Sequence, residues 1–159
     1  MTRQSTFMDR EFGRSDYDPS DEGEFERGLV FVIMPFSGVD MNEVYKAIKD
    51  ECRKLGLRTR RVDEGSGSGL VIREITDLIE RAEFIICDLT RERPNVYYEL
   101  GYAQGVGNDA DDILLIAKEG SILHFDIAPL RVRFYSSTKH LRSVVSTSLK
   151  AMIKATRKN

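Results

Sequence analysis

The sequence predicts a doubly wound α/β fold, in which helices cover both faces of a five-stranded parallel sheet. Short runs of branched and apolar residues alternate with longer segments of helical periodicity, which is the pattern of repeated strand–helix–strand units. Two of the runs, 29–34 and 83–88, are largely apolar, which is typical of central strands buried on both faces. The 159 residues, 41% of them hydrophobic, are enough for one domain with a substantial core.

Each predicted element has its own signal. Pro35 ends the first strand, and Gly56 is placed to end the first helix after an apolar stripe repeating every three or four residues. Pro94 suits the first turn of the third helix. The predicted strands are 29–34, 57–62, 83–88, 112–117 and 132–135, and the predicted helices are 42–55, 70–82, 94–105 and 141–155.

The order of the strands follows from handedness and hydrophobicity. Right-handed crossovers, with the two most apolar strands in the centre, give the order 2-1-3-4-5 of a flavodoxin- or Rossmann-like sheet. Residues 28–159 form this domain. Residues 1–27 carry eight acidic side chains and four arginines, with few aliphatic residues, and are predicted to be an acidic tail.

Composition excludes several classes of function. A net charge of -2 argues against a nucleic-acid-binding protein, and no apolar run is long enough to span a membrane. The N-terminus lacks the apolar centre of a signal peptide, so a cytoplasmic protein is expected. Two cysteines and two histidines, far apart in sequence, predict neither a disulfide framework nor a metal site, and no cofactor is expected.

The third predicted helix, 94–105, carries the most informative residues. In such a sheet, ligands bind beyond the carboxyl ends of the strands, at the switch between strands one and three, where this helix begins. Asn95, Glu99 and Tyr102 share one helix face, beside apolar positions, and Gly101 and Gly105 leave room for close approach. A carboxylate placed there suits glycosyl chemistry, because it can attack or shield the positive charge that develops at an anomeric carbon.

Four segments in order resemble the nucleoside 2-deoxyribosyltransferase-like superfamily. They are Ile33-Met-Pro-Phe36, Asp63-Glu64, Asp88-Leu-Thr90 and Pro94-Asn-Val-Tyr-Tyr-Glu-Leu-Gly101. The segment Glu99–Ala103 is also similar to related nucleotide N-glycosidases and to Toll/interleukin-receptor-like NAD-cleaving domains. The resemblance covers about residues 28–135.

The resemblance implies an enzyme that cleaves the N-glycosidic bond of a nucleoside, a nucleotide or an NAD-like molecule, by hydrolysis or transfer to another base. It makes Glu99 the nucleophile or stabilising carboxylate and Asp88 a second catalytic acid that orients the sugar or base. The implied substrate-binding residues are Met34, Pro35, Phe36, Asp63, Ser66, Gly67, Asn95 and Tyr98. The implied partner is a small molecule, and a homo-oligomer is expected because related enzymes complete their sites with neighbouring chains.

Alternatives remain open from the residues alone. The same cleft suits a non-catalytic nucleotide-binding sensor or interaction module, and a purely structural domain is the weakest reading. The glycines and serines of 65–69 either cradle a phosphate or form a plain flexible loop. Asp88 also fits a turn or helix-capping role, whereas a phosphate-accepting receiver site lacks its acidic pair after the first strand.

Overall fold

The structure, a computed structural model, describes residues 25–35, 38–62, 68–91, 93–124 and 130–158. The predicted acidic tail, 1–27, therefore lies almost entirely outside the described residues. Within the described ranges, five strands and four helices follow one another. The strands are β1 (Glu26–Ile33), β2 (Arg58–Arg60), β3 (Ala82–Asp88), β4 (Ile113–Lys118) and β5 (Val132–Tyr135), and the helices are α2 (Val39–Lys54), α3 (Ser68–Arg81), α4 (Pro94–Gly105) and α5 (Thr138–Thr156).

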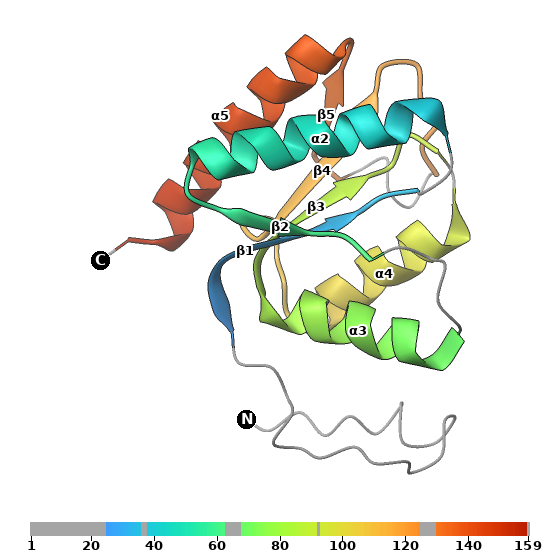
Figure 1. Cartoon of the computed structure of the whole chain (residues 1–159), viewed down its shortest axis with the longest axis vertical. Helices are drawn as coiled ribbons and strands as arrows, with labels where there is room; N and C mark the ends of the chain where they lie inside the picture. The colour runs from blue at the N-terminus through green and yellow to red at the C-terminus, as the bar shows by residue number, and fades with distance from the viewer. Residues whose placement is uncertain (1–24, 36–37, 63–67, 92, 125–129, 159) are drawn as a thin grey trace.

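The sheet confirms the predicted fold class. Its five strands have the order β2-β1-β3-β4-β5, and every neighbouring pair is parallel. Helices α2 and α5 cover one face, while α3 and α4 cover the other (Figure 1). The first and third strands lie in the centre, as their apolar sequences predict, and β3 is buried along its whole length. Among the described residues, no helix is both long and apolar enough to cross a membrane.

Side chains of the central strands alternate between two cores. Val30, Val32 and Ile86 belong to the core beneath α2 and α5, whereas Phe31 and Cys87 belong to the core beneath α3 and α4. The alternation follows from the two-residue repeat of a strand. It also sets the direction of any side chain at the end of β3, because consecutive residues there face opposite helical layers.

Helices α2, α3 and α5 all begin earlier than predicted, with α3 beginning at Ser68 rather than 70. Helix α5 begins at Thr138, three residues early, because the Ser137 hydroxyl caps it by accepting a hydrogen bond from the backbone N–H of His140 at 3.1 Å. Helix α2 begins at Val39 rather than 42. It ends at Lys54, one residue before the predicted end, and Gly56 follows it as the predicted stop. Gly56 takes a positive φ of 74°, and its N–H donates a hydrogen bond to the carbonyl of Arg53.

A buried ion pair joins the C-terminus of α5 to the amino end of the sheet. Glu83, at the start of β3, accepts hydrogen bonds at 2.7 Å from both Nε and Nη2 of Arg157 and another from the backbone N–H of Gly28. These contacts connect the start of β3 to Gly28, near the start of β1, and to Arg157, at the end of α5, and they stabilise the fold at the amino end of the sheet.

Candidate functional site at the carboxyl edge of the sheet

Asp88 is the last residue of β3, and its side chain is fully buried. Its Oδ1 atom accepts a hydrogen bond from the backbone N–H of Thr90 at 2.8 Å, closing a tight turn after the strand. Its Oδ2 atom accepts a hydrogen bond from the Tyr135 hydroxyl at 3.1 Å. The turn role weighed from the sequence is therefore present, together with a bond to the end of β5.

Hydroxyl groups extend this network across three strands. The Thr90 and Tyr135 hydroxyl oxygens lie 3.2 Å apart, and either can be the donor. The Thr90 hydroxyl also accepts a hydrogen bond from the backbone N–H of Lys118, at the end of β4, at 3.0 Å. Asp88, Tyr135, Thr90 and Lys118 thus tie together the carboxyl ends of β3, β4 and β5.

Burial dominates the electrostatics of this network. It raises the pKa of Asp88 because the carboxylate loses its hydration, and this outweighs the hydrogen bonds from Thr90 and Tyr135 and the positive charge of Arg91. Burial likewise raises the pKa of Tyr135, and the charges of Asp88 and Asp40 add to the effect. Both side chains therefore favour their neutral, proton-carrying forms more than exposed groups do.

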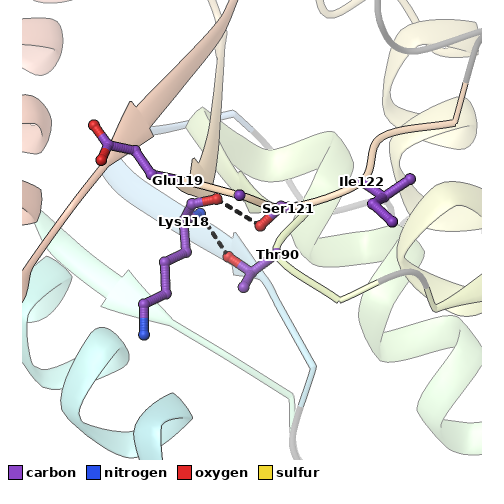
Figure 2. A pocket seen from close by; sticks show the side chains of 6 residues that line it. Thr90, Lys118, Glu119, Ser121 and Ile122 are labelled. Atoms are coloured by element: carbon purple, nitrogen blue, oxygen red, sulfur yellow. Dashed lines mark hydrogen bonds between the residues drawn. The ribbon is translucent and has the colours of Figure 1, made fainter.

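A shallow pocket of about 450 Å³ opens beside this network (Figure 2). Its lining consists of Thr90 together with the loop after β4, namely Lys118, Glu119, Gly120, Ser121 and Ile122. The Ser121 hydroxyl donates a hydrogen bond to the Lys118 carbonyl at 2.6 Å, which fixes the turn of this loop. The sequence predicted none of these residues as part of the site.

The loop after β4 connects the pocket to α4. Leu123 packs against the core beneath α3 and α4, and the ring of His124 lies 6.2 Å from that of Tyr97 on α4. Ile122, at the pocket, is 83% exposed. The pocket therefore presents polar backbone and hydroxyl groups on one side and an exposed apolar side chain on the other.

The side chain of Arg91 lies against Gly38, near the switch between β1 and β3 where the ligand was predicted. A Cβ atom added to Gly38 would lie only 2.4 Å from Nη2 of Arg91, so the guanidinium rests directly against the backbone at the start of α2. Arg91 thus bridges the loop after β3 and the loop after β1. It places a positive charge at the point where the connections of the sheet diverge.

Glu99 lies in the middle of α4, and its side chain is half-buried. It is one turn beyond Asn95, which is also half-buried, and beside Val96 and Ala103, which face the core. The Glu99 charge contributes to the raised pKa of the Cys87 thiol, after burial and the charge of Asp88. The carboxylate is therefore close enough to the end of β3 to act on it electrostatically.

The two predicted catalytic carboxyl groups belong to opposite layers. Asp88 bonds to Tyr135, which is part of the core beneath α2 and α5, whereas Glu99 is on α4, which covers the other face. Tyr98 is 61% exposed and lies on the outer side of α4. Because Asp88 is fully buried, Glu99 is the one of these two carboxyl groups that a ligand can contact directly.

The other predicted binding residues divide into two groups. Met34 and Pro35 are described and buried, and the Met34 sulfur lies 3.8 Å from Nη1 of Arg61 within the α2/α5 layer. Both residues lie in the interior, just after the carboxyl end of β1. Four predicted positions lie outside the described residues: Phe36, Asp63, Ser66 and Gly67. Among the residues that are described, no group of three His, Cys, Asp or Glu side chains is arranged to hold a metal ion.

Comparisons with known proteins show similarity in structure. No protein-family model and no curated protein matches the sequence. Among solved structures, the CMP N-glycosidase BcmB of Clostridium botulinum has a TM-score of 0.57 and 16% identity, covering 75% of this chain and 98% of that one. The diflavin flavoprotein A3 of Nostoc sp. has a TM-score of 0.53 and 15% identity, covering 85% and 96%.

The chain has a flavodoxin-like α/β fold. A flavo di-iron protein variant from Thermotoga maritima has a TM-score of 0.55 and 16% identity, but only 37% of its chain is covered, against 82% of this one. At these identities the similarity shows the flavodoxin-like fold alone, which is shared by a glycosidase and by flavoproteins. The function must be argued from the site.

Proposed function

We propose that the protein cleaves the N-glycosidic bond of a nucleoside or nucleotide, with Glu99 acting at the anomeric carbon. The observation that carries the proposal is the half-buried Glu99 carboxylate on α4, beside the carboxyl edge where ligands bind in this class of sheet. The similarity to a CMP N-glycosidase over nearly all of that protein's length supports the same reaction class.

The chemistry follows from the charge that develops during bond cleavage. As the C–N bond breaks, its electron pair goes to the base, and positive charge builds up at C1′ of the sugar. Glu99 either bonds to C1′ or stabilises this charge, and water then supplies the new oxygen at C1′ and releases a proton. The half-buried setting strengthens the attraction between the carboxylate and the sugar cation compared with bulk water.

Base release from a mixed substrate pool tests the proposal. The protein is incubated with nucleosides, nucleotides including CMP, and NAD, and free bases are measured by mass spectrometry. Glu99→Gln should lower release at least about 1,000-fold while leaving the melting temperature nearly unchanged. Glu43→Gln, which alters an exposed glutamate on α2, is the matched control and should retain full activity.

Two outcomes would contradict the proposal. Base release by Glu99→Gln at the wild-type rate would remove this residue from the reaction, and absence of base release from every substrate would remove the activity. Adding a free acceptor base to the same assay separates hydrolysis from transfer. Light scattering of the same samples tests the expected homo-oligomer.

A second candidate function is nucleotide binding without turnover. It is favoured by the flavoproteins among the structural neighbours, whose TM-scores are close to that of the glycosidase. Calorimetric titration with CMP and with FMN, accompanied by product analysis, separates the two functions. Binding without any free base would support the second candidate.

A further inference from the structure

A chain of hydroxyl groups links the buried Asp88 carboxyl group to the pocket. The Asp88 Oδ2 atom and the Tyr135 hydroxyl are 3.1 Å apart, and the Tyr135 and Thr90 hydroxyls are 3.2 Å apart. Thr90 is also the member of this chain that lines the pocket. Both separations are slightly longer than the usual O–H···O range of about 2.5–3.0 Å. They still connect the three groups in a continuous path from the interior to the pocket.

We propose that this chain is a proton relay, in which Thr90 donates a proton to the leaving base and Tyr135 and Asp88 resupply it. The inference rests on the proposed N-glycosidase function and adds a source for the proton that the base needs. Thr90 is the catalytic residue in this scheme because it touches the substrate. Tyr135 and Asp88 act through it.

Each proton moves by one hydrogen bond, so the step balances. As the glycosidic C–N bond breaks, the Thr90 hydroxyl proton goes to a ring nitrogen or carbonyl oxygen of the base. The Tyr135 proton moves to Thr90, and the Asp88 proton moves to Tyr135, which leaves Asp88 ionised. The proton released when water adds to C1′ returns to the chain after the product leaves.

The geometry allows the required direction of donation. A neutral Asp88 donates to Tyr135, Tyr135 donates to Thr90, and Thr90 donates into the pocket. The Thr90 oxygen can accept from Tyr135 and from the backbone N–H of Lys118 at the same time, because a hydroxyl oxygen has two lone pairs. When Asp88 is ionised, the Tyr135 hydroxyl turns around and donates to it, with no movement of the heavy atoms.

Burial favours the protonated form of Asp88, which supplies the proton at the inner end of the relay. Asp88 has no solvent exposure, and its raised pKa favours the neutral acid that the relay needs at its inner end. The same burial prevents Asp88 from touching a ligand directly. An intermediary is therefore required if this carboxyl group serves the pocket, and the Tyr135 and Thr90 hydroxyls are the groups that the structure provides.

Two leaving groups test the relay. The first substrate is CMP, or the nucleotide from the pool with the highest turnover, and its base needs a proton. The comparison substrate is 4-nitrophenyl riboside 5′-phosphate, whose nitrophenolate leaves without one. Thr90→Val and Tyr135→Phe should lower turnover of the nucleotide about 100-fold and turnover of the nitrophenyl substrate less than about 3-fold. Thr90→Ser keeps the hydroxyl and should retain nucleotide turnover.

A matched control removes a different tyrosine hydroxyl. Among the described residues, the buried hydroxyl of Tyr97 has no hydrogen-bond partner, so Tyr97→Phe should leave both substrates unaffected. Thermal unfolding of all variants excludes loss of the fold as the cause.

The possible results separate the relay from the proposed function. If Thr90→Val and Tyr135→Phe lose turnover of the nucleotide alone, the relay is supported. Glu99→Gln, by contrast, should lose turnover of both substrates. Equal losses on both substrates for Thr90→Val and Tyr135→Phe, or no loss on either, would overturn the relay and leave the glycosidase function standing. Failure of the wild-type protein to cleave either substrate would overturn both.

Discussion

Removal of Arg157 should show how much the ion pair at the amino end of the sheet stabilises the fold. In Arg157→Ala, Glu83 loses two of its three charged hydrogen bonds and keeps the one from the Gly28 backbone N–H. Glu83 has a side-chain exposure of only 6%, so water replaces the lost donors poorly. Breaking a buried pair by removing one partner costs about 3–5 kcal/mol.

The partial exposure of Arg157 makes the expected loss of unfolding free energy slightly smaller than this. Its side chain is 25% exposed, so some water reaches the vacated space, and we expect a loss of about 2–4 kcal/mol in the free energy of unfolding. For a domain of this size that corresponds to a fall of roughly 5–15 °C in melting temperature. Urea unfolding followed by circular dichroism measures it, and Lys158→Ala, which alters an exposed neighbour, is the control.

The pH dependence gives a second check on the same variant. Although burial raises the pKa of Glu83, the bonds from Arg157 and Gly28 and the charges of Arg157 and Arg27 outweigh it, and the net pKa is lowered. A lowered folded-state pKa contributes stability above the unfolded value, near 4.5, and the contribution is lost as the pH falls. The difference in unfolding free energy between wild type and Arg157→Ala should therefore have its full size at pH 7 and become smaller below pH 4.5. A loss under about 0.5 kcal/mol at pH 7, or one undiminished at pH 3, would refute the reasoning.

Two further predictions concern the backbone and the thiols. Gly38→Ala should destabilise the protein by about 1–3 kcal/mol in urea unfolding, because φ at this position is 133° and a Cβ atom would collide with Arg91; unchanged stability would contradict the geometry. Burial raises the pKa of Cys52 to about 12 and that of Cys87 well above its usual value, so both thiols should react with a disulfide reagent at pH 8 only after unfolding. Rapid labelling of the native protein would show that one of these thiols is accessible.

Most of the fold was predictable because its signals are local. The apolar runs of β1 and β3 require burial on both faces, and that requirement alone places them in the centre of the sheet. Pro94 and Gly56 mark helix ends through their own backbone preferences. The early start of α5 was missed because it depends on the Ser137 cap, a side-chain bond that adds a turn beyond the apolar periodicity.

The relay was not predictable because it depends on register between distant strands. Asp88 and Tyr135 are 47 residues apart, and they meet only because both β3 and β5 flank β4. Lys118 pairs with Tyr135, and Asp88 pairs with Ile116, so β3 ends two residues before the level at which β4 and β5 end. Nothing in the sequence of one strand sets this offset. The hydroxyl of Thr90, by contrast, stands two residues after Asp88 and was available as a signal.

The separation of Asp88 and Glu99 could have been inferred from the strand repeat, and it has a chemical consequence. Cys87 faces the layer of α4, so its neighbour Asp88 must face the layer of α2 and α5. In the proposed mechanism, sugar chemistry at Glu99 and proton donation through Thr90 therefore take place on opposite sides of one sheet edge. A nucleotide has the same division, because its anomeric carbon and the protonated atom of its base lie on different parts of the molecule. A substrate lying across the end of β3 would present the sugar to α4 and the base to the pocket, which is why changes at Thr90 and Glu99 should respond differently to the leaving group.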